Sequence, residues 1–269
     1  MTLLGRKNKN QISAEKIEKS LATLGVKDLP EVIYFYTIPS TNTEAKSRQD
    51  TGRRTLFIAD SQTGGRGRLG RSFQSPSGCG LYMSLLLYPE LSLSDGGYLT
   101  ALAAVAVCSV IEEMTPLRPK IKWVNDIYIG EKKLCGILTE GSALPFSDKM
   151  KYAVVGIGLN VTRGVREGVE SIATDIESEC GMRLDRCELA ARITAKILEL
   201  SEENNRNTVL EEYRKRCFLI GRRVRVVTPT DEYVATVLGI GESFELLVER
   251  ADGERVSLIT GEVTLRLDC

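Results

Sequence analysis

The spacing of apolar and polar positions along the chain predicts a body in which strands and helices are interleaved. Short β-rich runs bounded by turn residues are typical of strands. The predicted strands are 31–38, 56–60, 81–88, 121–129, 133–140 and 152–161, with a turn at 130–132. Apolar positions that recur every three to four residues are typical of helices. The predicted helices are 14–24, 41–48, 95–113, 185–203 and 208–216. We expect an α+β fold in which helices flank a mixed β-sheet.

Three of these helices begin with residues that commonly cap helix N-termini. Ser13 precedes the first helix, and Asp185 opens the fourth with Glu188 three residues later, as in a capping box. Thr41 and Glu44 have the same spacing, so we expect Thr41 to cap the second helix.

The pattern changes after Phe218, where helical spacing gives way to short strands separated by turn signals. The predicted strands are 222–228, 232–240, 243–250, 255–260 and 263–267. This succession is typical of a small all-β barrel. We therefore divide the chain into an N-terminal helix and linker (1–30), a main domain (31–218) and a C-terminal barrel (219–269).

Composition narrows the chemistry. The 269 residues include 36 Lys and Arg, 36 Asp and Glu, and no histidine. The balanced charge argues against a globally basic nucleic-acid-binding protein. The absence of histidine excludes Ser-His-Asp and Cys-His hydrolases, HExxH zinc proteases and Cys₂His₂ zinc fingers.

The cysteines and apolar segments indicate the compartment. No two of the 7 cysteines are spaced as CxxC, so we expect reduced thiols in a cytoplasmic protein rather than a Cys₄ zinc site. The N-terminus lacks the apolar core of a signal peptide, and the apolar segment 99–111 is too short to span a bilayer. We expect no association with a membrane.

The least ordinary stretch is the glycine- and arginine-rich segment 62–71, QTGGRGRLGR. Glycines let backbone N–H groups approach an anion, and arginines offer paired donors to carboxylate and phosphate oxygens. Residues 65–72 resemble a P-loop, but the residues that follow do not open a helix. Gly156 and Gly158 begin a dinucleotide fingerprint in which Val161 replaces the third glycine. We therefore expect neither a P-loop NTPase nor a Rossmann dehydrogenase.

Taken together, several motifs resemble those of the biotin–protein ligases. They are STN (40–42), QTGGRGRLGR (62–71), KWVND (122–126), GEKKLCGIL (130–138) and VVGIGLNV (154–161), in the order of that family. The resemblance runs from about Ile33 to the C-terminal barrel, with Val124 where the family usually has proline. It implies the catalytic fold shared by biotin and lipoate ligases, followed by an SH3-like barrel.

The resemblance implies an ATP-dependent, adenylate-forming ligase. The biotin carboxylate would attack the α-phosphorus of ATP to give biotinyl-5′-AMP and pyrophosphate. A lysine of a biotin carboxyl carrier protein, in acetyl-CoA carboxylase or a related carboxylase, would then accept the biotinyl group. Because a carboxylate is ionised at pH 7, the first step needs cations and positioning rather than a protein base. The expected ligands are biotin and ATP with Mg²⁺.

The resemblance assigns the biotin pocket to the STN segment, which would contact the ureido ring, and to the glycine-arginine segment, which would close over the ligand. The implied biotin-binding residues are Ser40, Thr41, Asn42, Gln62, Gly65, Arg66, Gly67, Arg68 and Lys133. Without the resemblance, the STN residues would be interpreted as helix caps and Lys133, beside Lys132, as a solvated turn residue.

The resemblance also assigns the nucleotide side and the chemistry. The implied nucleotide-binding residues are Arg71, Phe73, Lys122, Asn125, Asp126, Gly158 and Asn160. The implied catalytic residues are Arg68 at the carboxylate and α-phosphate, Lys133 at the acyl-phosphate, and Asp126 near the acceptor amine. Asp126 and Asn160 are the candidate Mg²⁺ ligands.

Other functions stay open on the sequence. A lipoate or octanoate ligase would share the fold, although the STN residues and Gln62 suit a ureido ring better. A biotin-operon repressor would need a helix-turn-helix, so we expect no DNA binding unless this chain is a shortened form. An RNA-binding protein would use the glycine-arginine strip, but interleaved aromatic residues and a basic charge balance are lacking. The resemblance also allows a homodimer.

Overall fold

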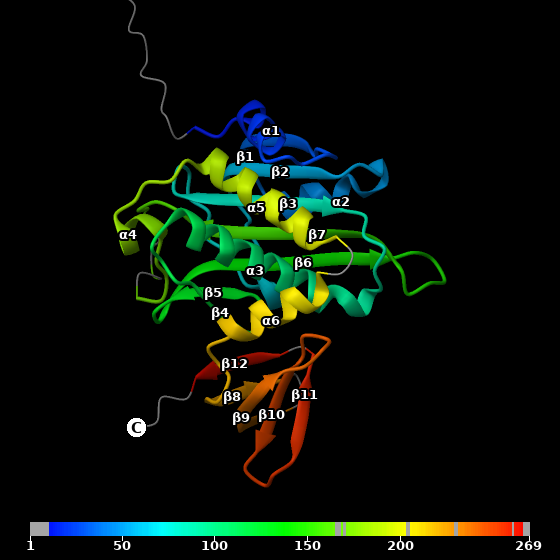
Figure 1. The fold of residues 1–269 in the computed structure, drawn as a ribbon, viewed down its shortest axis with the longest axis vertical. Helices are drawn as coiled ribbons and strands as arrows, with labels where there is room; N and C mark the ends of the chain where they lie inside the picture. The colour runs from blue at the N-terminus through cyan, green and yellow to red at the C-terminus, as the bar shows by residue number, and fades with distance from the viewer. Residues whose placement is uncertain are drawn as a thin grey trace, which may run out of the picture.

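A seven-stranded sheet forms the centre of the main domain (Figure 1). The computed structural model describes residues 11–164, 168, 171–202, 205–228, 231–259 and 261–265. The strands are β1 (Glu31–Ile38), β2 (Thr55–Gln62), β3 (Gly80–Leu87), β4 (Lys120–Lys122), β5 (Asp126–Ile129), β6 (Lys132–Ala143) and β7 (Met150–Asn160). Their order is β1-β2-β3-β7-β6-β5-β4. β1 and β2 run parallel and the other neighbouring pairs are antiparallel, so the predicted mixed sheet is confirmed.

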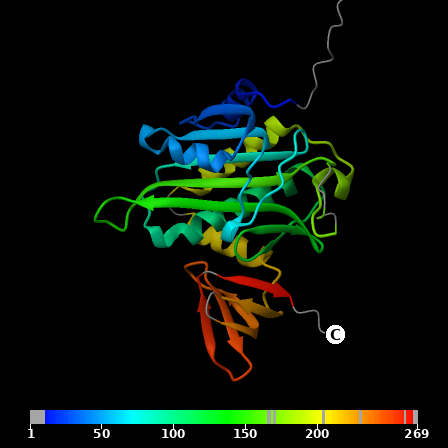
Figure 2. The ribbon, with the colours of Figure 1, turned by 180° about the vertical axis from the view of Figure 1, so that it is seen from behind.

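The two faces of this sheet are covered differently (Figures 1 and 2). One face carries the larger helices α1 (Ala14–Thr23), α3 (Gly96–Met114), α5 (Arg186–Leu200) and α6 (Arg206–Arg216), with the short α4 (Ile176–Cys180) near the sheet's end. The other face carries only α2 (Thr41–Ser47) among the described helices, together with the segment between β2 and β3. This less covered face is where a cleft can form.

The core lies between the sheet and the larger helices. α3 is buried on nearly all sides because it packs against β6, α5 and α6 at once. It is long and apolar enough to cross a membrane by composition, but most of it is buried inside the protein, as is usual for a core helix. A second, smaller apolar cluster lies under α2 and includes Ala45, Phe57 and Leu86.

Ser13 and Asp185 cap α1 and α5, as predicted. For α2 the prediction was wrong. Its cap is Ser40, whose side chain accepts a hydrogen bond from the Thr43 N–H at 3.4 Å, whereas Thr41 is the first helical residue. The serine, one residue earlier, lies in extended backbone and so satisfies the exposed N–H, which leaves the Thr41 side chain for other contacts.

The segment predicted as one strand, 121–129, is instead two. β4 and β5 are joined by a turn at 123–125 and pair with each other, with Lys122 opposite Asp126. Two of its three residues, Trp123 and Val124, are apolar and buried, so only Asn125 has the polar character of a turn. Because apolar residues occupy this turn, the sequence pattern through it resembles that of one continuous strand.

The C-terminal strands form a second sheet, consistent with an SH3-like domain. It contains β8 (Arg223–Val227), β9 (Glu232–Ile240), β10 (Leu246–Arg250), β11 (Arg255–Leu258) and β12 (Glu262–Leu265), all antiparallel, in the order β11-β10-β9-β8-β12. The predicted strand 243–250 starts later than expected, because 241–245 forms a turn directed at the main domain.

Phe244, in the turn between β9 and β10, joins the C-terminal sheet to helices α3 and α6 of the main domain. It is 2% exposed, and its ring centroid lies 5.7 Å from that of Tyr98 and 6.0 Å from that of Tyr213. Its carbonyl accepts a hydrogen bond from the Trp123 indole N–H at 2.9 Å. The turn that separates β4 from β5 therefore rests directly on the C-terminal sheet.

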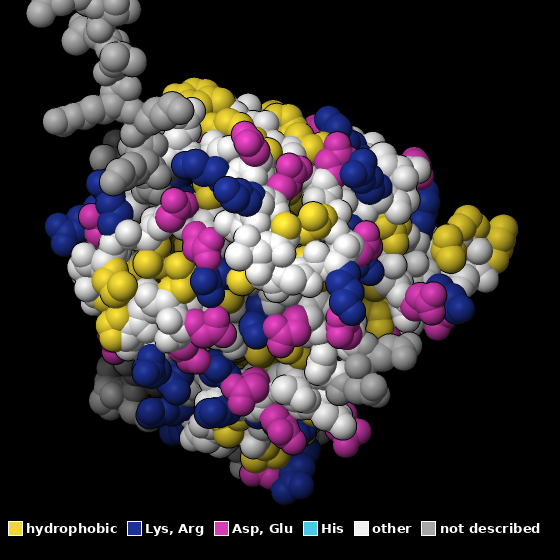
Figure 3. Space-filling view, turned by 45° about the horizontal axis from the view of Figure 1, so that its top comes forward, with side chains coloured by type: hydrophobic (Ala, Val, Ile, Leu, Met, Phe, Trp, Pro, Cys, Tyr) yellow, Lys and Arg dark blue, Asp and Glu magenta, His cyan; other side chains and the backbone are white. Residues whose placement is uncertain are grey.

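Surface charge is mixed. On the face seen in Figure 3, lysine and arginine side chains are interspersed with aspartate and glutamate, in keeping with the equal numbers of the two signs in the sequence. That face offers no broad basic surface to a nucleic acid.

Candidate active site

A cleft opens on the α2 face of the main sheet because glycines leave its floor without side chains. Gly156 and Gly158 project to the same face of β7, and Gly136 pairs with Gly158 from β6. A Cβ atom on Gly156 would overlap the Asn42 amide, and one on Gly158 would lie 2.6 Å from the Phe73 ring. Glycine is therefore required at these positions if α2 and the glycine-arginine segment are to pack close to the sheet and form the walls of the cleft.

Most of the predicted site residues meet in this cleft, whose volume is about 210 Å³. The predicted residues that line it are Ser40, Thr41, Asn42, Gln62, Arg66, Gly67, Arg68, Arg71, Phe73, Lys122, Asn125, Asp126, Lys133 and Gly158. Gly65 lies just beneath the lining, where the Phe73 N–H donates to its carbonyl at 2.9 Å. A side chain on Gly65 would lie 2.8 Å from Ser75 Oγ, so glycine lets the ends of the segment approach.

Asn160 does not reach the cleft. It shares the β7 face with Gly156 and Gly158, but it is buried and its Nδ2 donates to the Thr174 carbonyl at 2.9 Å. Asn160 and Asp126 therefore do not converge, and the described residues contain no group of three or more His, Cys, Asp or Glu side chains able to hold a metal. Asp126 and Asn160 therefore do not fit the predicted pair of Mg²⁺ ligands.

At one end, here called the amide end, the cleft is lined by Ser40, Thr41, Asn42 and Gln62. The Thr41 N–H and hydroxyl both donate to Gln62 Oε1, at 2.9 and 3.2 Å. Gln62 Nε2 donates to Ser75 Oγ at 2.9 Å. The Gln62 amide is thus held in one orientation by donors on one side and an acceptor on the other.

Asn42 is held in the same way. Its Nδ2 donates to the Leu138 carbonyl at 3.2 Å and to Glu140 Oε2 at 2.9 Å, while its Oδ1 lies 2.6 Å from Ser84 Oγ. Burial raises the pKa of Glu140, but hydrogen bonds from Lys46 and Asn42 outweigh that effect and leave the pKa below its usual value. The four side chains that define the amide end are therefore neutral hydrogen-bonding groups, with a carboxylate behind them.

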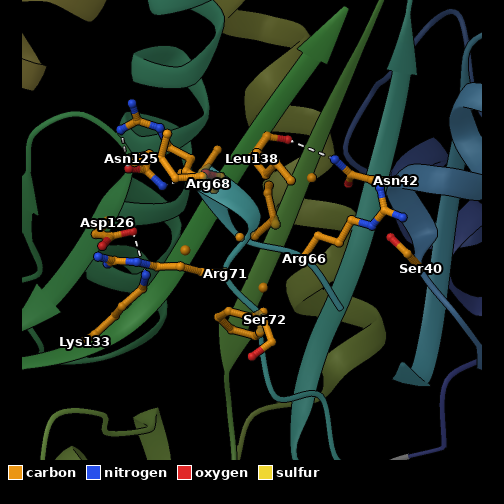
Figure 4. A pocket seen from close by; sticks show the side chains of 18 of the residues that line it. Ser40, Asn42, Arg66, Arg68, Arg71, Ser72, Asn125, Asp126, Lys133 and Leu138 are labelled. Atoms are coloured by element: carbon orange, nitrogen blue, oxygen red, sulfur yellow. Dashed lines mark hydrogen bonds and ion pairs between the residues drawn. The ribbon is translucent and has the colours of Figure 1, made fainter. Parts of the chain in front are cut away.

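The glycine-arginine segment folds back on itself as a narrow hairpin over the cleft. Its two sides are joined by backbone hydrogen bonds from Gln62 to Ser75, from Phe73 to Gly65 and from Gly67 to Arg71. Figure 4 shows Arg66 directed toward Ser40 and Asn42, whereas Arg68 and Arg71 extend toward Asn125 and Asp126. One short segment thus supplies guanidinium groups to both ends of the cleft.

The opposite end, here called the cationic end, contains Arg68, Arg71, Lys122 and Lys133 beside Asn125 and Asp126. Lys133 Nζ lies 2.7 Å from Asp126 Oδ1, and Arg68 Nη1 donates to Asn125 Oδ1 at 3.2 Å (Figure 4). Lys132 is exposed and is not part of the cleft lining. The register therefore selects Lys133 rather than its neighbour.

Sequence reasoning missed several residues of the cleft. Met83, Ile157 and Leu138 form part of its walls, and Gly261 and Val263 reach it from the C-terminal sheet. Glu140 was also missed, although it touches Asn42. The alternation along β6 was available as a signal, because Gly136, Leu138 and Glu140 project to one face, but nothing local shows which segment covers that face.

Known proteins share this fold. Residues 34–160 match the biotin/lipoate A/B protein ligase family, and residues 219–266 match the biotin protein ligase C-terminal domain. A biotin protein ligase from Aquifex aeolicus, solved in complex with biotin and ATP, has a TM-score of 0.71 and 30% identity, covering 87% of this chain and 98% of that one.

Sequence relatives agree. The bifunctional ligase/repressor BirA of Bacillus subtilis is 34% identical over 234 residues, covering 82% of this chain and 70% of the relative. The biotin–[acetyl-CoA-carboxylase] ligase of Mycobacterium tuberculosis is 31% identical over 207 residues, covering 74% of this chain and 75% of the relative. The fold is thus that of an ATP-dependent ligase. The chain belongs to the biotin/lipoate protein ligase family, among its biotin–protein ligases.

Proposed function

We propose that this chain activates biotin with ATP and transfers it to a lysine on a carrier domain of a biotin-dependent carboxylase. The observation that carries the proposal is that one hairpin joins two chemically different ends of a single cleft. A neutral, hydrogen-bonding end suits the ureido ring of biotin. A cationic end beside it suits the meeting of a carboxylate with a polyphosphate.

In the first step, a biotin carboxylate oxygen forms a bond to the α-phosphorus of ATP, and the bond from that phosphorus to pyrophosphate breaks. Two anions must approach, so fixed cations lower the barrier by offsetting their repulsion. Arg68, on the hairpin, and Lys133, on β6, are placed at the cationic end for this role. Phe73, whose ring lies over the Gly158 backbone, offers an apolar surface on which adenine can stack.

In the second step, a lysine amine attacks the acyl carbon of biotinyl-5′-AMP, AMP leaves, and the amine loses a proton. Asp126 is the one carboxylate among the described residues of the cleft lining, and it pairs with Lys133, to which we assign contact with the acyl-phosphate. We propose that it orients the incoming amine.

The six cysteines that the structure describes as free thiols agree with the expected cytoplasmic location.

A lipoate or octanoate ligase is the competing function on the same fold. Its acid carries an apolar end, which could form no hydrogen bonds with the polar side chains of Thr41, Asn42 and Gln62, whereas a ureido ring offers both donors and acceptors. The amide end therefore favours biotin.

ATP–pyrophosphate exchange with Mg²⁺, run in parallel with biotin, lipoate, octanoate or no acid, tests this function. We expect exchange with biotin, followed by AMP release when a purified unbiotinylated carrier domain is added. Exchange with lipoate or octanoate instead of biotin would show that the protein is a lipoate or octanoate ligase. No exchange with any acid, by protein shown to be folded, would refute the adenylating role.

A further inference from the structure

Glu140 lies behind the amide end, outside every motif that carries the family resemblance. Its Oε2 accepts a hydrogen bond from Asn42 Nδ2 at 2.9 Å, and its Oε1 lies 2.5 Å from Lys46 Nζ. Asn42 and Lys46 are four residues apart on α2, so both project from the same side of that helix. One carboxylate on β6 therefore contacts two consecutive turns of α2.

The chemistry of these partners decides how the Asn42 amide is turned. A carboxylate and a backbone carbonyl can only accept hydrogen bonds, so Glu140 and the Leu138 carbonyl both require the NH₂ group of Asn42. Ser84 Oγ, on the other side, would tolerate either orientation because a hydroxyl both donates and accepts. The two acceptors on β6 thus leave Oδ1 on the side of Gly156 and the cleft floor.

We propose that Glu140 is a positioning and specificity-determining residue, which fixes the Asn42 amide so that its oxygen accepts a hydrogen bond from an N–H group of the bound acid. Lys46 holds the Glu140 carboxylate in place. The inference rests on the proposed function, because a ureido ring supplies the N–H donor that a dithiolane or an alkyl chain lacks. Glu140 itself does not line the cleft and acts through Asn42.

A purely structural role would look different. If the Lys46–Glu140 pair only attached α2 to β6, its loss would disturb the KM values for biotin and ATP alike. If Glu140 sets the Asn42 amide, its loss weakens recognition of the acid, leaves the ATP side unchanged and depends on Asn42 being present.

The experiment uses full-length protein and biotin-dependent ATP–pyrophosphate exchange. The variants are Glu140→Gln, Glu140→Asp, Asn42→Ala and the Asn42→Ala/Glu140→Gln double variant. Glu44→Gln is the matched control, because Glu44 is also a carboxylate in an ion pair at α2, but its partner is Arg48, at 2.9 Å, rather than Asn42. Glutamine keeps the length of the side chain but presents an NH₂ group that lets the Asn42 amide turn over.

We expect Glu140→Gln to raise KM for biotin about 3–12-fold, within the range for one lost hydrogen bond between neutral groups, here the Asn42 amide oxygen and an N–H of the acid. KM for ATP should change by less than about twofold, as should both constants in Glu44→Gln. In the Asn42→Ala background, Glu140→Gln should add less than about twofold, because the residue through which it acts is gone. Glu140→Asp, which keeps the charge but withdraws the carboxylate, provides the same test if glutamine impairs folding.

Three results would overturn the inference while leaving the proposed function intact. These are an unchanged KM for biotin in both Glu140 variants, equal rises in KM for biotin and ATP, or full additivity with Asn42→Ala. A wild-type protein that supports exchange with lipoate or octanoate but not biotin would refute the proposed function, and this inference with it. The wild-type measurement therefore separates the two failures.

Discussion

The two ends of the cleft differ in how deeply their side chains are buried. At the amide end, Ser40, Thr41 and Asn42 are 4%, 3% and 6% exposed. At the cationic end, the side chains of Lys133 and Asp126 keep 32% and 23% of their surface exposed. Neutral polar groups that are buried must be hydrogen-bonded within the fold, because an unpaired one is costly. Charged groups nearer to solvent can exchange their partners when an anion arrives. The first end is therefore built before the ligand binds, and the second is completed by it.

This difference predicts that the largest losses of activity come from the cationic end. Arg68→Ala removes a guanidinium from the point where carboxylate and phosphate meet, and we expect kcat/KM for biotin-dependent exchange to fall about 100–1000-fold. Arg192→Ala is the control, since Arg192 pairs with Glu188 at 2.6 Å on the far side of the sheet. A loss of only a few-fold in Arg68→Ala would show that the cationic end is not where charge is stabilised.

Lys133 offers a second test, with its neighbour as the control. Lys133→Ala should lower kcat/KM for exchange about 100-fold, because Lys133 faces the cleft and pairs with Asp126. Lys132→Ala should remain within about twofold, since Lys132 is exposed. Equal losses in the two variants would contradict the observed register of β6 against β5.

Phe73 packs over the glycine floor at Gly158 and should distinguish the two ends by substrate. We expect Phe73→Ala to raise KM for ATP about tenfold, because stacking on a base contributes about 1–3 kcal/mol. KM for biotin should rise less. Phe146→Ala, at the exposed turn between β6 and β7, should change neither constant. A larger effect on biotin than on ATP would place Phe73 at the amide end.

The smallest effect concerns stability rather than catalysis, and it tests whether Glu140 is paired in the fold. Hydrogen bonds from Lys46 and Asn42 hold its pKa below the usual 4.5 in the folded state. A depressed pKa contributes stability above the unfolded-state value, and this is lost as pH falls through the folded-state value. Urea unfolding should therefore show wild type more stable than Glu140→Gln by about 0.5–1.5 kcal/mol at pH 7. The difference should shrink below pH 4.5, and growth of the difference with acidity would contradict this account.

Much of the fold and site could be predicted because their signals are local. Helix caps such as Ser13 and Asp185, strand alternation, and motif residues such as Arg68 and Lys133 each depend on a few neighbouring positions. The Ser40 cap was missed by one residue, because serine and threonine there have similar capping chemistry.

The remaining site contacts could not be predicted, because they depend on which segment, distant in the sequence, covers a given face of a strand. Strand alternation places Asn160 on the cleft face of β7, but only the fold shows that Thr174 covers it. The same alternation places Glu140 on the cleft face of β6, but only packing of α2 brings Asn42 to it. Val263 reaches the cleft from the other sheet, which no pattern near the motifs could indicate.

The Phe244 contact has a thermodynamic consequence. Unfolding of the C-terminal sheet alone would withdraw this ring from Tyr98 and Tyr213 and remove the acceptor of the Trp123 indole, so part of the main core would be exposed as well. The two sheets should therefore melt in a single cooperative transition rather than one after the other, as a single calorimetric peak would show. Trp123 also lines the cleft, two residues before Asn125. Loss of the C-terminal sheet would therefore remove a contact that holds the turn of the cationic end in place.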